Sequence, residues 1–258
     1  MTDHRAVAET LFAARRDRTA IPPITDADPS LTADDGYAIQ QDLVRLLLAD
    51  GGSIVGYKLG LTSKPMQQLI GVDQPDYGPV LSPTVFDDGA SIDLGHYIQP
   101  KVETEIALIL DRHLRGPGVT ALQAAQAIRG AVAAIELVDS RIVGWRIKLV
   151  DTIADLASSA AVIVGDRIVR LDGWDIRLCG AVVTRNGATV ATGAGAAALG
   201  SPVHALAWLA NTLGAFDVTL EPDHFVMTGA LHAAFPVEPG DLVRAEFDRL
   251  GPLTVTFH

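Results

Sequence analysis

The chain has 258 residues, of which 48% are hydrophobic and 20% are charged. This much apolar material is enough for one large core or two modest ones, and it excludes a disordered chain. Thirty-one acidic residues against 20 basic ones give a net charge of −11, which argues against a nucleic-acid partner because phosphate backbones attract basic surfaces.

The apolar runs are too short for a membrane span, which needs roughly 20 residues. The start carries Asp3, His4 and Arg5 without a long apolar core behind them, so we expect no signal peptide. The single cysteine, Cys179, forms no intrachain disulfide and predicts a reducing, cytoplasmic setting.

The first fifty residues are predicted to be helical. Residues 4–18 are alanine-rich with helical spacing, and a break with three prolines follows at 19–29. Thr32 stands three residues before Asp35, a weaker relative of the capping box, and opens a second helix. We expect this helix to end at 50–52, where two glycines allow the left-handed conformation.

From residue 54 onwards, the sequence pattern predicts β-strands as well as helices. Residues 54–61 are predicted as a strand, followed by a short helix from Ser63 to a stop at Gly71. The stretch 71–83 contains three prolines and two glycines besides its acidic residues, and is predicted to be a loop. Residues 101–110 give the clearest strand.

The second half alternates between short helices and strands. Residues 120–133 have helical spacing, and 134–138 is predicted as a buried strand. Residues 182–192 are predicted as a hairpin around Asn186-Gly187, the strongest two-residue hairpin signal. The remaining predictions are a helix at 202–213 and strands at 225–228, 242–247 and 253–257.

These elements predict an α+β fold with a mostly antiparallel or mixed sheet. The alternation of strands and helices is too irregular for a doubly wound sheet. We divide the chain into an N-terminal helical part, 1–52, and a mixed-sheet part, 53–258, which together form one compact unit.

Two glutamates share one face of the strand predicted at 101–110. Side chains alternate along a strand, so Glu103 and Glu105 point the same way, with Cβ atoms about 6–7 Å apart. Like charges this close resist joint ionisation unless a cation lies between them. A hard divalent cation with oxygen ligands is one interpretation. A solvated strand end with two exposed glutamates is the other.

A third carboxylate lies in an otherwise apolar run, 133–138. Glu136 is costly to bury there unless it is paired or bound to metal. Three carboxylates without Cys or His suit magnesium or manganese better than zinc. The alternative is a buried salt bridge to Arg141 or Lys148.

Other candidates lie near glycines, prolines and hydroxyl groups. Lys58, flanked by Gly56 and Gly60, could hold an anionic substrate or act as an acid–base, or it could be a surface lysine. Asp76 is a candidate acid–base, although Asp in such a turn is often only a turn residue. Hydroxyls such as Ser158 could bind a carboxylate or could cap a helix.

Five short sequence segments resemble those of one protein family. They lie at 56–63 (GYKLGLTS), 71–78 (GVDQPDYG), 100–107 (PKVETEIA), 136–141 (ELVDSR), and 150–155 with 157–159 (VDTIAD, ASS). Together they resemble the 2-keto-4-pentenoate hydratase and 4-oxalocrotonate decarboxylase family, relatives of fumarylacetoacetate hydrolase. The resemblance covers nearly the whole chain. It implies a mixed β-sheet roll of the fumarylacetoacetate hydrolase C-terminal type with an N-terminal helical part.

The resemblance also implies residue roles. Glu103, Glu105 and Glu136 would bind Mg²⁺ or Mn²⁺, and Lys58 and Asp76 would be catalytic. The substrate would contact Leu59 and Ser158. Relatives form homo-oligomers, so we expect one here, and a complex with another enzyme of the pathway stays open. Relatives usually carry Asn where this chain has Leu156.

The implied activity is hydration of 2-hydroxypenta-2,4-dienoate to 4-hydroxy-2-oxopentanoate in meta-cleavage degradation of aromatic compounds. A 2-oxo acid offers a carboxylate oxygen and a keto oxygen to a hard cation. The apolar stretch 229–235 most resembles hydratases. Decarboxylation of 2-oxo-3-hexenedioate and a related C–C hydrolysis are alternatives. A catalytically weak partner subunit is a further one, suggested by Leu156.

Overall fold

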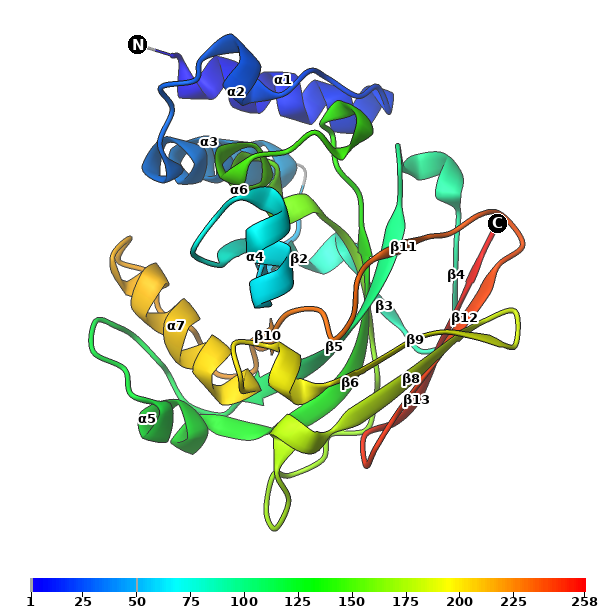
Figure 1. Cartoon of the computed structure of the whole chain (residues 1–258). Coiled ribbons are helices and arrows are strands. Elements are labelled where there is room, and N and C mark those ends of the chain that lie inside the picture. Colours follow the sequence, from blue (N-terminus) through cyan, green and yellow to red (C-terminus); the bar gives the residue numbers. More distant parts are fainter. Residues whose placement is uncertain (1, 50) are drawn as a thin grey trace.

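The computed structural model describes residues 2–49 and 51–258, and it has two mixed sheets with helices around them (Figure 1). The predicted α+β class is confirmed. Within the described residues, no helix is both long enough and apolar enough to cross a membrane.

Three N-terminal helices lie together at one end of the molecule (Figure 1): α1 (His4–Asp17), α2 (Ile24–Ala27) and α3 (Ala33–Leu47). The predicted Thr32–Asp35 pairing is confirmed as a capping box that satisfies backbone N–H groups at the start of α3. This helix ends at Leu47, before the predicted stop, and Asp50 lies outside the described residues. The stretch predicted as a break contains the short α2.

The larger sheet carries the strand predicted at 101–110. Its strand order is β2-β1-β10-β5-β6-β7-β3, with β11 beside β5. The strands are β1 (Ile54–Gly60), β2 (Asp76–Leu81), β3 (Val85–Asp87), β5 (Lys101–Leu110), β6 (Ile128–Val138), β7 (Ser159–Val164), β10 (Phe225–Met227) and β11 (Phe235–Pro236).

The smaller sheet has the order β4-β13-β12-β8-β9. Its strands are β4 (Ala90–Ile92), β8 (Gly180–Arg185), β9 (Ala188–Ala194), β12 (Leu242–Phe247) and β13 (Gly251–Phe257). The predicted hairpin is confirmed: Asn186 and Gly187, both with positive φ, join β8 to β9. Cys179 is buried.

Four further helices pack around the sheets: α4 (Lys64–Ile70), α5 (Ala121–Gln126), α6 (Leu149–Ala154) and α7 (Pro202–Gly214). The predicted start of α4 at Ser63 and its stop at Gly71 are confirmed, with Gly71 in the left-handed conformation. Buried contacts join the N-terminal helices to the rest. Gln40 of α3 donates to the carbonyls of Tyr77 and Ile153.

Two predictions were wrong. The stretch 71–83 is not all loop, because β2 occupies Asp76–Leu81. Since β2 is an edge strand, it pairs with another strand on one side only. Pro79, which has no N–H, is accepted in such a strand because no neighbouring strand needs a donor on the free side. The helix predicted at 120–133 ends at Gln126, and β6 begins at Ile128. Pairing of β6 with both β5 and β7 overrides the helix propensity of its alanines.

Candidate functional site

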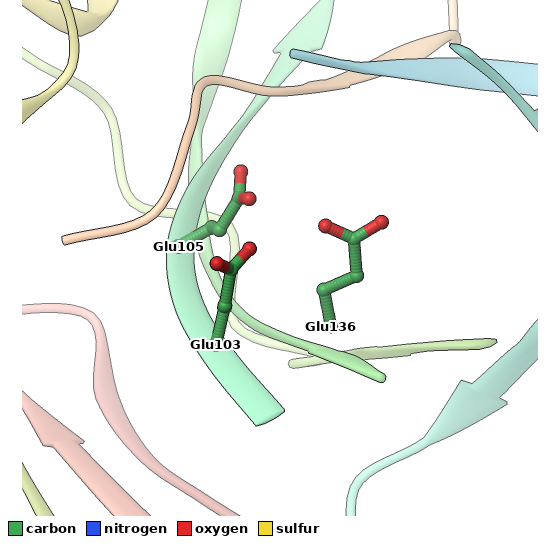
Figure 2. A group of neighbouring side chains, drawn as sticks. All are labelled: Glu103, Glu105 and Glu136. Atoms are coloured by element: carbon green, nitrogen blue, oxygen red, sulfur yellow. The ribbon is translucent and has the colours of Figure 1, made fainter. Parts of the chain in front are cut away.

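Three glutamates from two neighbouring strands meet above the larger sheet. Glu103 and Glu105 share a face of β5, and antiparallel pairing places Glu103 directly opposite Glu136 of β6. One carboxylate oxygen from each lies within 4.8 Å of the others. Figure 2 shows the three carboxylates pointing into a common space. The alternative of a solvated strand end with two exposed glutamates is wrong, because Glu105 is buried and Glu103 is half-buried.

The carboxylates are poorly compensated by the protein. Glu105 Oε2 accepts a hydrogen bond of 2.7 Å from the Gly229 N–H, whereas Glu105 Oε1 and both Glu136 oxygens have no hydrogen-bond partner among the described residues. Burial raises the pKa of Glu103 to about 7; repulsion from Glu136 adds to this shift, and Lys58 opposes it. Burial also raises the pKa values of Glu105 and Glu136.

This donor set fits a hard divalent cation. Three converging carboxylates, with buried oxygens that lack donors, offer oxygen ligands without nitrogen or sulfur, which suits Mg²⁺ or Mn²⁺. A cation there would offset the repulsion that raises these pKa values.

Lys58 lies beside the glutamates, in the middle of β1. It is 2% exposed, so the interpretation as a surface lysine is wrong. Its Nζ donates to the Ala157 carbonyl at 2.9 Å and lies 3.2 Å from Glu136 Oε2, a close ion pair without hydrogen-bond geometry. Burial opposes the ammonium charge, but attraction by Glu136 and the other carboxylates outweighs it and raises the Lys58 pKa.

The partners suggested for Glu136 from the sequence are therefore wrong. Arg141 instead forms a buried ion pair with Asp155, and its backbone N–H donates to Asp155 Oδ2 at 2.8 Å. Lys148 is exposed. Spacing along the sequence does not indicate Lys58 as the partner of Glu136, because 78 residues separate the two.

Asp76 begins β2 and is fully buried. Its Oδ2 accepts a hydrogen bond of 3.0 Å from the Thr152 hydroxyl of α6, while Oδ1 has no hydrogen-bond partner among the described residues. Burial raises the Asp76 pKa, with Lys58 and Thr152 opposing the shift. A buried strand residue with this surrounding is not a simple turn residue.

A strained turn, Leu156–Ser158, connects α6 to β7. All three residues have φ between 51° and 58°, a region that non-glycine residues rarely adopt. The carbonyl of Leu156 packs so closely on Gly78 that a Cβ at Gly78 would lie 2.2 Å from it. The Leu156 side chain packs in the apolar cluster of the N-terminal helices, with Leu11 and Ile39.

A cavity of about 1060 Å³ opens beside the glutamates. The predicted residues Lys58, Leu59, Asp76, Glu103 and Ser158 all line it. The Ser158 hydroxyl is buried without a hydrogen-bond partner among the described residues. The apolar part of the wall includes Met66, Ile70, Ile147, Leu199 and the stretch 230–234 apart from His232.

Sequence reasoning missed two supporting residues. Thr152 holds Asp76, and the Gly229 N–H holds Glu105. Gly229 has φ +113°, and a Cβ there would lie 2.0 Å from Thr62 Oγ1, so the position requires glycine. No local signal marks this contact, because 124 residues separate Gly229 from Glu105.

The chain is similar to known proteins over most of its length. The family model described as fumarylacetoacetate (FAA) hydrolase C-terminal matches residues 64–258. The chain is 41% identical over 252 residues to 2-keto-4-pentenoate hydratase 1 of Dechloromonas aromatica (strain RCB), covering 98% of this chain and 96% of the relative.

Two further similarities extend over almost the whole chain. The 2-oxo-hept-4-ene-1,7-dioate hydratase of Escherichia coli is 35% identical over 260 residues, covering 98% of this chain and 97% of the relative. The solved 4-oxalocrotonate decarboxylase from Pseudomonas putida G7, complexed with magnesium and adipate, superposes with a TM-score of 0.96 at 35% identity. That match covers 99% of this chain and 97% of the decarboxylase.

Proposed function

Because this chain belongs to the fumarylacetoacetate hydrolase family, we propose that it is a divalent-metal-dependent hydratase that converts 2-hydroxypenta-2,4-dienoate to 4-hydroxy-2-oxopentanoate. The full-length similarity to named 2-keto-4-pentenoate hydratases supports this reaction. The observation that carries the proposal is the convergence of three glutamates, of which Glu103 lines a large cavity while Glu105 and Glu136 have buried oxygens without a hydrogen-bond partner among the described residues.

Glu103, Glu105 and Glu136 would hold the cation, and Mg²⁺ or Mn²⁺ suits them. When bound, such a cation supplies positive charge that stabilises negative charge developing on the 2-oxo oxygen of the substrate. Lys58 adds a second, fixed positive charge, because Glu136 and the Ala157 carbonyl hold its ammonium in place.

The reaction needs proton movements at defined atoms. The dienol loses its 2-hydroxyl proton and gains one at C5, which gives a conjugated 2-oxo-enoate. Water then adds its oxygen at C4 and a proton at C3. Asp76 lines the cavity, and burial raises its pKa, the direction that favours a carboxyl group able to take up and release a proton. We propose Asp76 as the group that moves these protons, with Thr152 orienting it.

Decarboxylation of 2-oxo-3-hexenedioate is a second candidate, favoured by the close superposition on 4-oxalocrotonate decarboxylase. The two reactions share the metal-binding glutamates and the 2-oxo acid group, so these features do not separate them. Leu156 gives little support to a catalytically weak partner, because its side chain packs among the N-terminal helices.

The test follows the ultraviolet absorbance of 2-hydroxypenta-2,4-dienoate with the purified protein, with Mg²⁺ and with a chelator. We expect a Mg²⁺-dependent loss of the dienol and formation of 4-hydroxy-2-oxopentanoate. The Glu105→Gln variant should stay folded by circular dichroism and lose this turnover. Faster consumption of 2-oxo-3-hexenedioate would favour the decarboxylase, and no turnover of either compound would favour a weak partner subunit.

Four statements remain predictions: the homo-oligomer, the complex with another enzyme, the cytoplasmic location, and the boundary between the helical and mixed-sheet parts at residues 52 and 53. Light scattering tests the first of these directly.

A further inference from the structure

The lysines of this chain are concentrated in one place. The sequence has four lysines and sixteen arginines. Three of the lysines, Lys58, Lys64 and Lys101, line the cavity beside the glutamates, and no arginine among the described residues lines it. In a chain of net charge −11, these ammonium groups give the cavity local positive charge where an anionic ligand would bind.

Two of these ammonium groups are already engaged. Lys58 is held by Glu136 and the Ala157 carbonyl. Lys64 Nζ donates to Gln67 Oε1 at 3.0 Å within α4. By contrast, no hydrogen bond or ion pair joins the Lys101 ammonium to an acceptor within residues 2–49 and 51–258.

Lys101 is held by an aromatic ring instead. Its Nζ lies 4.3 Å from the centroid of the Trp145 ring, which also lines the cavity. The Trp145 indole N–H donates to the Gln99 carbonyl at 3.2 Å and so fixes the ring. A cation–π contact places the ammonium without neutralising its charge or using its N–H donors in conventional hydrogen bonds. Lys101 therefore remains able to bind an anion.

The position of Lys101 relative to the glutamates sets which anion it could bind. Lys101 shares the face of β5 with Glu103 and Glu105. Along the strand it lies about 6–7 Å from Glu103 and about 13 Å from Glu105. It lies on the outer side of Glu103, away from the fully buried Glu105. Both Glu103 and Lys101 line the cavity, so a 2-oxo acid whose head lies at the glutamates can extend toward Lys101.

His232, which also lines the cavity, does not offer a competing donor. His232 Nε2 accepts the Thr104 backbone N–H at 3.2 Å, and its Nδ1 lies 2.9 Å from the Ala233 carbonyl. Both ring nitrogens of His232 are thus engaged, and the neighbouring wall is made of alanine and leucine side chains.

We propose that Lys101, held by Trp145, forms a subsite for a second carboxylate at the outer end of the cavity. The chain therefore accepts dicarboxylic substrates of the same reaction in addition to the five-carbon monoacid. This inference rests on the proposed function, since it assumes that a 2-oxo acid head lies at the glutamates. It adds a substrate class that the metal-binding residues alone do not specify.

Binding of two saturated six-carbon acids tests the subsite. 2-Oxoadipate and 2-oxohexanoate share the 2-oxo acid head and chain length, and differ only in a terminal carboxylate against a methyl group. Neither has the double bond needed for hydration. Isothermal titration calorimetry with saturating Mg²⁺ should give about tenfold tighter binding of 2-oxoadipate, the effect expected of one charge-assisted hydrogen bond.

Lys101→Met should abolish the preference for 2-oxoadipate, leave 2-oxohexanoate binding unchanged and keep the Mg²⁺ affinity. Lys101→Arg should keep part of the preference for 2-oxoadipate. Lys148→Met is the matched control, because Lys148 is the one lysine outside the cavity lining, and it should keep the full preference. Equal binding of the two acids by the unaltered protein, or a preference that survives Lys101→Met, would overturn the subsite while leaving the hydratase proposal intact. If neither acid binds, the 2-oxo acid site fails, and the subsite fails with it.

Discussion

At the scale of single residues, Lys58 connects the glutamates to the strained turn. Its ammonium touches Glu136 on one side and the Ala157 carbonyl on the other. It is therefore placed to contribute charge to the reaction and, at the same time, to compete with a metal ion for Glu136. These two effects make opposite predictions for activity and for metal affinity.

We expect Lys58→Met to lower kcat at least about 100-fold, the range lost when a positioned acid–base or charged group is removed. The Mg²⁺ affinity should stay the same or increase, because a positive charge beside Glu136 is gone. Turnover assays and calorimetric Mg²⁺ titration measure the two effects, with Lys148→Met as a surface control. A marked loss of Mg²⁺ affinity would assign Lys58 a structural role instead.

The sequence alone predicts part of this site. Alternation along one strand is enough to place Glu103 and Glu105 on the same face, because it is a local property of the backbone. The pairing of Glu136 with Glu103 depends on the register between β5 and β6, which lie 33 residues apart at these positions. The contact of Lys58 with Glu136 joins still more distant segments, so spacing pointed to the wrong partners.

At the scale of elements, the close packing of β2 on the turn Leu156–Ser158 fixes the turn. Gly78 has no side chain, and this lets the Leu156 carbonyl approach the strand. This turn presents the Ala157 carbonyl to Lys58 and places Ser158 at the cavity. A methyl group at position 78 would force the two segments apart.

Gly78→Ala should therefore lower the melting temperature and reduce turnover at least about tenfold, since a strained native backbone contact costs more than about 1 kcal/mol. Thermal unfolding and the dienol assay test this. Gly165→Ala is the matched control, because a Cβ there would meet its nearest atom, the Ala133 carbonyl oxygen, at an ordinary 3.4 Å. Equal stability and activity of the two variants would mean that the Gly78 contact does not hold the turn.

The elements that sequence reasoning placed correctly are those with strong local signals. The capping box at Thr32, the Asn186-Gly187 hairpin and the strand 101–110 needed no tertiary information. The errors at β2 and β6 have one cause: prolines and alanines, which disfavour strands locally, are accepted where the sheet supplies an edge or pairing on both sides.

At the scale of the whole molecule, we expect the three glutamates to make folding depend on metal and on pH. Three like charges lie together on β5 and β6 of the larger sheet, and the protein compensates them mainly with one lysine and one backbone N–H. Without a cation, the folded chain binds protons at these glutamates more tightly than the unfolded chain does, because burial raises all three pKa values and repulsion between carboxylates adds to the shift at Glu103 and Glu105.

Raised carboxyl pKa values stabilise the fold at low pH, and this stabilisation is lost as pH rises through the folded values. For Glu103 the window runs from its ordinary value of 4.5 to about 7. In the presence of a chelator, we expect the melting temperature to fall by about 5 °C or more across this window. Mg²⁺ should oppose the fall, because it binds the ionised carboxylates, so its stabilising effect should grow with pH. Glu105→Gln should flatten the chelator curve and weaken the response to Mg²⁺. Melting curves that do not depend on Mg²⁺ at any pH would contradict a metal site at these three glutamates.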